Sequence, residues 1–221
     1  ETPRERLARV KKTAVERGYP AGVIELLDKN EETIEFVANY EEKKDSSPAQ
    51  TIGDDLIQGE IPELIQWDER WGYASYGTSI VAVSGCGPTC LSMVASGLTG
   101  DASITPASVA AYGTANGYVD EENNTYWKLM SDGCAAWGLT CYEGEIEKTA
   151  VVSQLQAGHP IICSVGPGDF TDKGHFIVLA GYEDGKIKVN DPFSKENTEN
   201  LWEFERLEGQ IKALWIYSLK R

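Results

Sequence analysis

The sequence has few histidines and no long apolar run. His159 and His175 are the only two histidines among 221 residues, so a catalytic or metal-binding histidine has just two possible positions. Two histidines leave little to build a zinc site with, and no spacing of two cysteines and two histidines occurs. A phosphate-loop motif is also missing, and no apolar run reaches the ~18 residues of a membrane-spanning helix. We therefore expect no metal, no cofactor and no span within these residues.

Basic residues are outnumbered by acidic ones. The chain has 20 lysines and arginines against 35 aspartates and glutamates, which gives a formal net charge of −15. This charge argues against nucleic-acid partners and against adsorption to an anionic membrane surface. Hydrophobic residues make up 41% of the chain and include six tryptophans. That is enough for the core of one ordinary domain with an extension, and we expect a monomer.

The cysteine count is odd, so at least one thiol is free. The five cysteines are Cys86, Cys90, Cys134, Cys141 and Cys163. Cys86 is the natural free thiol, whereas Cys90 and Cys163 lie in apolar segments and read as packed core residues. Cys134 and Cys141 flank a predicted helix end and could form a disulfide, which only their geometry can decide.

The stretch Gly85–Thr89 places a cysteine at the start of a helix. An apolar run follows it at helical spacing, and Pro88 fits the first turn, where its missing N–H costs nothing. Unpaired N–H groups and the positive dipole end at a helix N-terminus favour a thiolate over a thiol. Cys86 therefore has the position of a nucleophile. The alternative is a small buried residue that happens to begin a helix.

His175 and Asp191 are predicted to meet across a hairpin. Gly174–Gly181 is a continuous apolar run typical of a buried strand, and Lys186–Pro192 alternates like a second strand after a Glu-Asp-Gly turn. Antiparallel pairing brings the first residue of one strand near the last of the next. Each residue alone could be structural. Together with Cys86 they indicate the nucleophile, base and orienter of a cysteine acyl-transfer enzyme.

From Ile61 to the C-terminus the chain resembles a known enzyme family. The motifs that carry the resemblance occur in the family's order: Gln66–Gly72, Ser84–Thr89, Gly174–Leu179 and Asn190–Pro192. Together they resemble the papain-like superfamily, in the branch related to double-glycine (bacteriocin-processing) cysteine peptidases, as the stand-alone form common in secreted bacterial proteins. The resemblance implies a Cys86 nucleophile, a His175 base and an Asp191 orienter.

The oxyanion hole departs from the usual papain-like pattern. The position at which many papain-like enzymes carry a glutamine is Ile80 in this sequence. Gln66 is the only nearby glutamine in a family-like motif, and a loop would have to fold it back over Cys86. We predict Gln66 and the backbone N–H of Cys86 as oxyanion donors. The alternative for Gln66 is a loop glutamine that hydrogen-bonds the backbone.

Three further residues are expected to shape the substrate cleft. Gly87 and Gly174 adjoin the predicted nucleophile and base, and glycine lets a backbone approach closely. Trp127 is a candidate cleft wall, with packing in the core as the alternative.

The predicted fold class is α+β: a papain-like fold with N-terminal helices packed against an antiparallel sheet. We expect a helical extension or spacer over 1–45 in three helices, a linker over 46–60 and the papain-like domain over 61–221. Within the domain, helices are expected from Thr105 to Gly117, from Asn124 or Thr125 to Gly138, and from Glu147 to Gly158.

The expected activity is thiol-dependent hydrolysis of peptide bonds in a peptide or protein substrate, in an extracellular or cell-surface bacterial protein. Any signal or anchor segment is expected to lie before Glu1. Two alternatives stay open. One is an amide hydrolase or transferase that acts on peptidoglycan cross-bridges or isopeptide bonds and associates with the cell wall. The other is a non-catalytic cell-surface binding module on the same fold.

Overall fold

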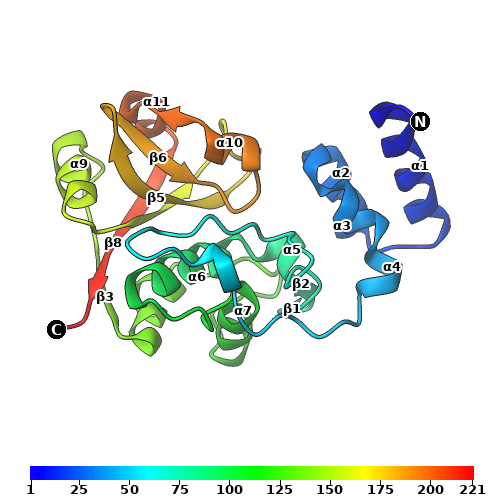
Figure 1. The fold of residues 1–221 in the computed structure, drawn as a ribbon, viewed down its shortest axis with the longest axis horizontal. Coiled ribbons are helices and arrows are strands. Elements are labelled where there is room, and N and C mark those ends of the chain that lie inside the picture. Colours follow the sequence, from blue (N-terminus) through cyan, green and yellow to red (C-terminus); the bar gives the residue numbers. More distant parts are fainter.

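A six-stranded antiparallel sheet forms the centre of the fold (Figure 1), a computed structural model that describes all 221 residues. The strand order is β3-β8-β4-β5-β6-β7. The strand bounds are β3 Leu139–Glu143, β4 Ile161–Val165, β5 His175–Glu183, β6 Lys186–Asn190, β7 Leu201–Trp202 and β8 Ile211–Leu219. A separate hairpin pairs β1 (Ser75–Tyr76) with β2 (Ser79–Ile80). The predicted antiparallel sheet is therefore confirmed.

Most helices precede the sheet in the sequence, as expected for the α+β class. Their bounds are α1 Pro3–Glu16, α2 Ala21–Lys29, α3 Ile34–Ala38, α4 Tyr40–Lys43, α5 Val81–Ser84, α6 Cys86–Thr99, α7 Pro106–Ala115, α8 Lys128–Ser131, α9 Lys148–Gln156, α10 Lys195–Glu199 and α11 Phe204–Glu208. Short 3-10 turns are η1 Glu31–Thr33, η2 Gly53–Asp55 and η3 Gly133–Trp137. None of these helices has both the length and the apolar character needed to cross a membrane.

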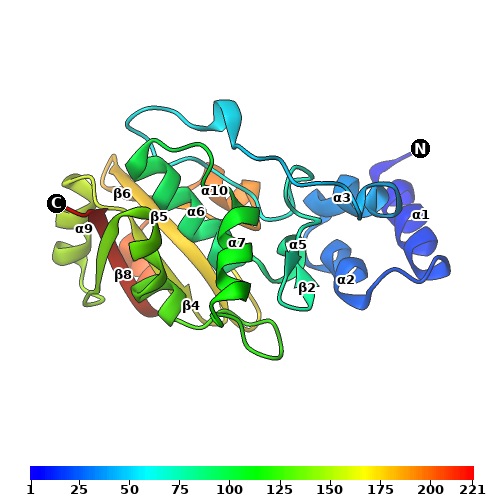
Figure 2. The same ribbon diagram turned by 90° about the horizontal axis from the view of Figure 1, so that it is seen from below.

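Helices cover both faces of the sheet. Helix α6 and its neighbour α7 lie across one face, as Figure 2 shows, while α9 and α11 pack on the other. Strand β5 serves both cores: Phe176 and Val178 face α6, and Ile177 and Leu179 face α9 and α11. Because both faces are covered, β5 is a continuous apolar run rather than an alternating strand.

Helix α6 is the buried centre of the helical layer. It begins at Cys86, as predicted, with Pro88 in its first turn, and ends where Gly100 takes a left-handed conformation (φ 73°). Glycine adopts that conformation without the steric cost that other residues incur. Residues 87–96 are all buried, so the position of Cys86 is fixed by the packing of the whole helix.

The N-terminal extension packs on the rest of the molecule as a helical unit. Its apolar side chains, among them Leu26 and Phe36, share one core with Trp67, Tyr73 and Ala82 of the following domain. In Figure 1 the extension lies at one end of the molecule, beside α5 and α10. The predicted breaks fall where the helices end, at Gly18–Pro20 and Asn30.

Residues 46–60, the expected linker, lie along the domain surface. The Ala49 N–H donates to the Arg70 carbonyl (2.8 Å), and the Ile52 N–H donates to the Ala102 carbonyl (2.9 Å). The Ile52 side chain is fully buried. This segment is thus an ordered connection and not a free tether.

The prediction of a single helix from Asn124 or Thr125 to Gly138 is wrong. Only α8 and η3 form there, as two short pieces. Thr125 makes an isolated β-bridge with Val119, which keeps its backbone extended where the helix was expected to begin. Asp132 separates the two pieces, and Gly133, a poor helix former, begins the second.

We predict that Gly72→Ala destabilises the fold by about 1–3 kcal/mol, as overpacking does. A Cβ at Gly72 would lie 2.6 Å from Cε2 of Phe36 and 2.8 Å from the Asp68 carbonyl oxygen, so the extension would be displaced. Gly209→Ala is the matched control, because a Cβ there meets nothing within 4 Å and its φ is −71°. Chemical denaturation of both variants measures the difference, and equal stabilities would contradict this prediction.

Candidate active site

Cys86 lies between the helical layer and the sheet. It is the first residue of α6 and is half-buried. The His175 side chain and the backbone N–H groups of Phe176 and Gly87 lie close enough to its sulfur to lower the pKa of the thiol. Phe176 belongs to β5, so the thiol is held by donors from both layers. This arrangement suits a thiolate better than a thiol.

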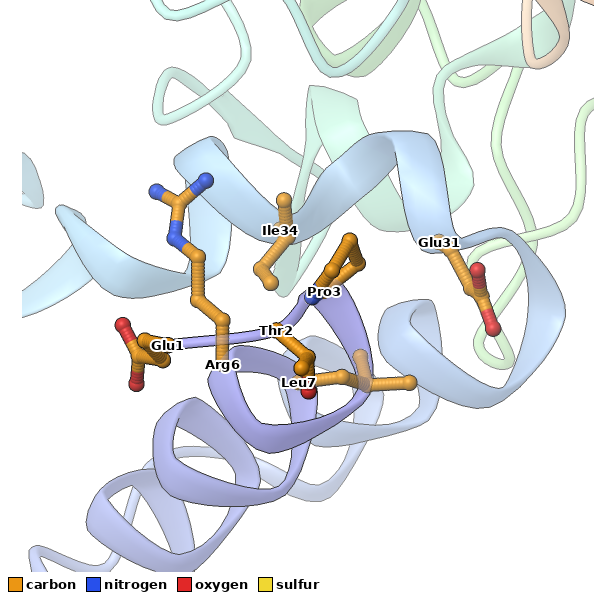
Figure 3. Close-up of a pocket in the computed structure, with 7 residues that line it drawn as sticks. All are labelled: Glu1, Thr2, Pro3, Arg6, Leu7, Glu31 and Ile34. Carbon is orange, nitrogen blue, oxygen red and sulfur yellow. The ribbon is translucent and has the colours of Figure 1, made fainter.

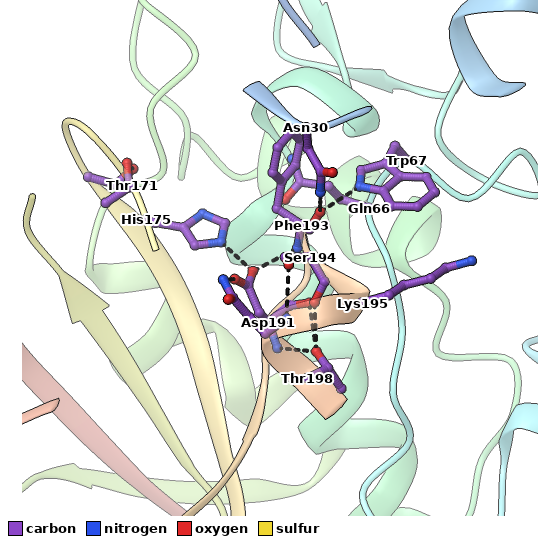
Figure 4. Close-up of polar contacts among 12 residues, drawn as sticks. Asn30, Gln66, Trp67, Thr171, His175, Asp191, Phe193, Ser194, Lys195 and Thr198 are labelled. Carbon is purple, nitrogen blue, oxygen red and sulfur yellow. Dashed lines mark hydrogen bonds and ion pairs between the residues drawn. The ribbon is translucent and has the colours of Figure 1, made fainter. Parts of the chain in front are cut away.

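His175 and Asp191 meet where the sequence predicted. His175 opens β5, Asp191 directly follows β6, and a tight turn at Asp184 and Gly185 joins the two strands. The Nε2 atom of His175 lies 2.8 Å from Oδ1 of Asp191 (Figure 4). Since Nε2 is hydrogen-bonded to the carboxylate, Nδ1 is the ring nitrogen available to exchange a proton with Cys86. The ring of Phe193 lies edge-on to the imidazole, with centroids 6.4 Å apart.

The segment after β6 surrounds the Asp191 carboxylate with donors. Oδ1 accepts a second hydrogen bond from the Phe193 N–H (2.8 Å), and Oδ2 accepts one from Nδ2 of Asn197 (2.9 Å). The Asp191 N–H itself donates to Oγ1 of Thr198 (2.9 Å). With 1% exposure, this carboxylate is buried, and a buried charge requires such partners.

Sequence reasoning did not single out Phe193, Asn197 or Thr198. The usable signal was local: Ser194 caps a turn by accepting from the Asn197 N–H (3.0 Å). Ser194 is the N-cap of α10, and this capped first turn brings the Asn197 side chain back toward the Asp191 carboxylate.

The electrostatics favour an ion pair between Cys86 and His175. Burial raises the pKa of the Cys86 thiol. His175, through hydrogen bonding and charge, and the two backbone N–H groups together lower this pKa by more than burial raises it, so the net shift is downward. Burial lowers the pKa of His175, but the charge and hydrogen bond of Asp191, together with Cys86, raise it to about 10. Both shifts favour the thiolate–imidazolium pair over the neutral thiol and imidazole.

Gln66 is folded back beside the start of α6. The hairpin of β1 and β2 returns the chain, so that the buried Gln66 amide donates from Nε2 to the Ala82 carbonyl (2.9 Å). The Gln66 backbone N–H also donates to the Pro192 carbonyl (2.7 Å), next to Asp191. The Oε1 atom has no partner. One amide hydrogen thus bonds the backbone, and the second is free for another acceptor.

The expected cleft residues have different surroundings. A Cβ at Gly87 would lie 2.8 Å from Oγ1 of Thr125, so a neighbouring loop, rather than open space for substrate, occupies the position above Gly87. Gly174 is exposed, with only the Val165 carbonyl oxygen as near as 4.0 Å. Trp127 is 46% exposed and packs edge-on against Trp215, with centroids 5.5 Å apart. Trp127 is therefore a surface residue rather than a core one.

The other four cysteines are also free thiols. Cys90 and Cys163 are fully buried, and burial raises the pKa of both thiols. Cys134 and Cys141 are neighbours whose thiols both donate to the Ser131 carbonyl oxygen, at 3.7 and 3.3 Å. No disulfide joins them in this structure.

A surface pocket is present elsewhere, on the N-terminal extension (Figure 3). Its polar lining includes Glu1, Arg6 and Glu31, and Arg6 is already paired with Glu35. The pocket contains no residue of the Cys-His-Asp site. No group of three or more histidine, cysteine or carboxylate side chains is arranged to hold a metal ion.

A cysteine at the N-terminus of a buried helix and a His–Asp pair on an antiparallel sheet are the arrangement expected from the sequence for the papain-like fold. Residues 59–219 match the model of the Peptidase_C39 like family, and the chain belongs to that family. The resemblance inferred from the sequence motifs is thereby confirmed. No curated protein matches the chain.

Two solved structures are similar to the chain. One is the peptidase domain of Streptococcus ComA, a bi-functional ABC transporter involved in a quorum-sensing pathway. It is 19% identical over 62% of this chain and 93% of its own, with a TM-score of 0.46. The other is a C39-like peptidase from Bacillus anthracis, 14% identical over 76% of this chain and 98% of its own, with a TM-score of 0.49.

We predict that iodoacetamide alkylates Cys86 rapidly at pH values well below ~8.5, the pKa of a free thiol. The thiolate is lost only as the pH falls through the lowered pKa of Cys86, while His175 keeps its proton until the pH approaches about 10. In His175→Ala, burial still raises the pKa of Cys86, but the imidazolium that lowers it is gone. Alkylation at pH 6 should then slow by at least about tenfold, the effect of one pKa unit. Equal rates in the two proteins would contradict the ion pair.

Proposed function

We propose that this protein hydrolyses peptide bonds with Cys86 as nucleophile, His175 as acid and base, and Asp191 as the group that orients His175. One observation carries the proposal: the His175 imidazole is hydrogen-bonded to the buried Asp191 carboxylate (2.8 Å) and lies close enough to Cys86 to lower the pKa of its thiol. Membership of the Peptidase_C39 like family supports the same reaction class.

The geometry supports a two-step mechanism. The Cys86 thiolate attacks the carbonyl carbon, a C–S bond forms, and His175 passes its Nδ1 proton to the leaving amine as the C–N bond breaks. Water then attacks the thioester carbonyl while His175 takes its proton as general base; a C–O bond forms, the C–S bond breaks, and the acid product leaves with the Cys86 thiolate and the His175 imidazolium restored. Asp191 keeps the ring in the tautomer with Nδ1 toward the sulfur, because Oδ1 holds Nε2.

Two donors are available for the oxyanion. The Cys86 N–H is at the first residue of α6, where helical N–H groups have no partner within the helix. The free amide hydrogen of Gln66 is the second donor, and the bond from Nε2 to the Ala82 carbonyl fixes the plane of the amide. Donors that are already oriented stabilise the developing charge without reorganisation.

We propose a peptide or protein as the substrate. The net charge of −15 would favour a cationic substrate over an anionic one through long-range attraction.

Cys86→Ala should abolish cleavage of fluorescein-labelled casein, because the nucleophile is removed and alanine fits a helix well. Cys141→Ser is the matched control, since Cys141 is also half-buried and lies outside the site. We expect that control to keep its rate. A folded Cys86→Ala protein that cleaves casein as fast as the wild type would overturn the proposal. Release of peptides from purified cell wall, with no casein cleavage, would instead assign the wall cross-bridge as substrate.

For Gln66→Ala we expect kcat to fall by about 10²–10³, the usual effect of removing one oxyanion donor. KM should change little, because the donor acts on charge that develops in the transition state. Steady-state kinetics on the best casein-derived peptide measures both constants. An unchanged kcat would mean that the Gln66 side chain is not an oxyanion donor and only hydrogen-bonds the Ala82 carbonyl.

A further inference from the structure

The N-terminal extension contacts the segment that carries Asp191. Asn30, at the end of α2, donates from Nδ2 to the Phe193 carbonyl (2.9 Å). The N–H of the same residue, Phe193, donates to Oδ1 of Asp191, the oxygen that also holds His175. As Figure 4 shows, a single residue thus lies between the extension and the carboxylate.

A second contact holds the other side of the carboxylate. The Glu32 carboxylate accepts hydrogen bonds from the Lys195 N–H (2.8 Å) and the Glu196 N–H (3.2 Å), the first two residues of α10. Helix α10 in turn carries Asn197, whose side chain donates to Oδ2 of Asp191. Asn30 and Glu32 therefore reach both carboxylate oxygens, each through one short stretch of backbone.

The extension is also fixed to the opposite layer, which carries Cys86. The Phe36 ring stacks on Tyr73 with centroids 4.0 Å apart, and the Tyr73 hydroxyl donates to the Phe36 carbonyl (2.7 Å). Gly22 lies against Val83, just before Cys86 in the chain, where a Cβ would come within 2.9 Å. In Figure 1 these helices lie beside both α5 and α10.

From these contacts we propose that the N-terminal extension is a positioning element of the active site. Asn30 and Glu32 act as positioning residues that hold Asp191 in hydrogen-bonding geometry with His175. This inference rests on the function proposed above. The extension is then more than a spacer, because it helps to activate Cys86 through Asp191 and His175.

The physical reason is the sensitivity of a charge-assisted hydrogen bond to geometry. Residues 191–199 form a loop and one short helix at the edge of the sheet, and Trp67 is the other side chain that donates to the Phe193 carbonyl (2.7 Å). Without Asn30 and Glu32, Phe193 keeps only the Trp67 bond, while the Gln66 N–H still holds Pro192 and Lys188 and Trp202 still hold the carbonyls of Thr198 and Asn197. A displacement of ~1 Å at a catalytic group can cost about 10²-fold in rate. The Asp191 carboxylate would then stabilise the imidazolium less.

The test uses the full chain with Asn30→Asp, Glu32→Ala and the double variant. In Asn30→Asp the side-chain oxygen can still accept from the Glu32 N–H, so the cap of η1 is kept. The Nδ2 donor to the Phe193 carbonyl, which also donates to Oε1 of Glu32 (3.3 Å), is lost and replaced by an oxygen that repels both. The controls are Glu35→Ala and Lys11→Ala, whose partners Arg6 and Asp28 lie within the extension.

The measurement is the pH profile of Cys86 alkylation by iodoacetamide, with thermal unfolding of every protein beside it. We expect the profile of the double variant to move to higher pH, with a rate at pH 6 lower by about tenfold, the effect of one pKa unit. The single variants should show smaller shifts in the same direction. The controls should keep the wild-type profile, whatever their melting temperatures.

Two results separate the possible failures. If wild-type Cys86 is activated and the three variants keep its pH profile, even with lowered melting temperatures, the extension is only structural and this inference is overturned. If wild-type Cys86 itself reacts like an ordinary thiol, the proposed function fails instead. Asn30→Asp keeps the test valid should the double variant not fold, because it preserves the local cap and changes one donor.

Discussion

The hydrogen bond between the buried Asp191 carboxylate and His175 is the interaction on which the rest of the site depends. A carboxylate that is 1% exposed is costly unless it is paired and hydrogen-bonded. The segment after β6 meets that cost with Phe193 and Asn197, and His175 supplies the opposite charge. In the proposed function, the imidazolium so formed stabilises the Cys86 thiolate, and its charge lowers the pKa of that thiol. The Asp191 carboxylate stabilises the His175 imidazolium, which stabilises the Cys86 thiolate. The loss of one donor at Asp191 is therefore expected to raise the pKa of Cys86.

The fold places these charges by joining two layers with different origins. The buried helix α6 fixes Cys86, and a tight hairpin of β5 and β6 fixes His175 and Asp191. Contacts between the layers must then set the distance from sulfur to imidazole. Gln66 is one such contact, since its backbone bonds to Pro192 in one layer and its side chain to Ala82 in the other. The N-terminal extension, packed on both layers, is a second.

The parts of this site that local patterns determine were predictable from the sequence. Cys86 at a helix start follows from Pro88 and the apolar run after it, and the meeting of His175 with Asp191 follows from a short turn between two strands. Contacts between distant segments were not predictable. Asn30 and Phe193 are 163 residues apart, and nothing in either segment indicates the other. The sequence places Gly87 at the substrate cleft but does not indicate Thr125, whose side chain packs against it; tertiary packing and not local sequence decides which side chain lies against a glycine.

The ionisation of His175 gives the most direct test of this account. With only two histidines in the chain, the imidazole resonances can be assigned with a single His159→Gln variant and followed by NMR as the pH is raised. We predict that His175 titrates near pH 10 in the wild type and at clearly lower pH in Asp191→Asn. An imidazole that titrates at its ordinary pKa of about 6.5 in both proteins would contradict it.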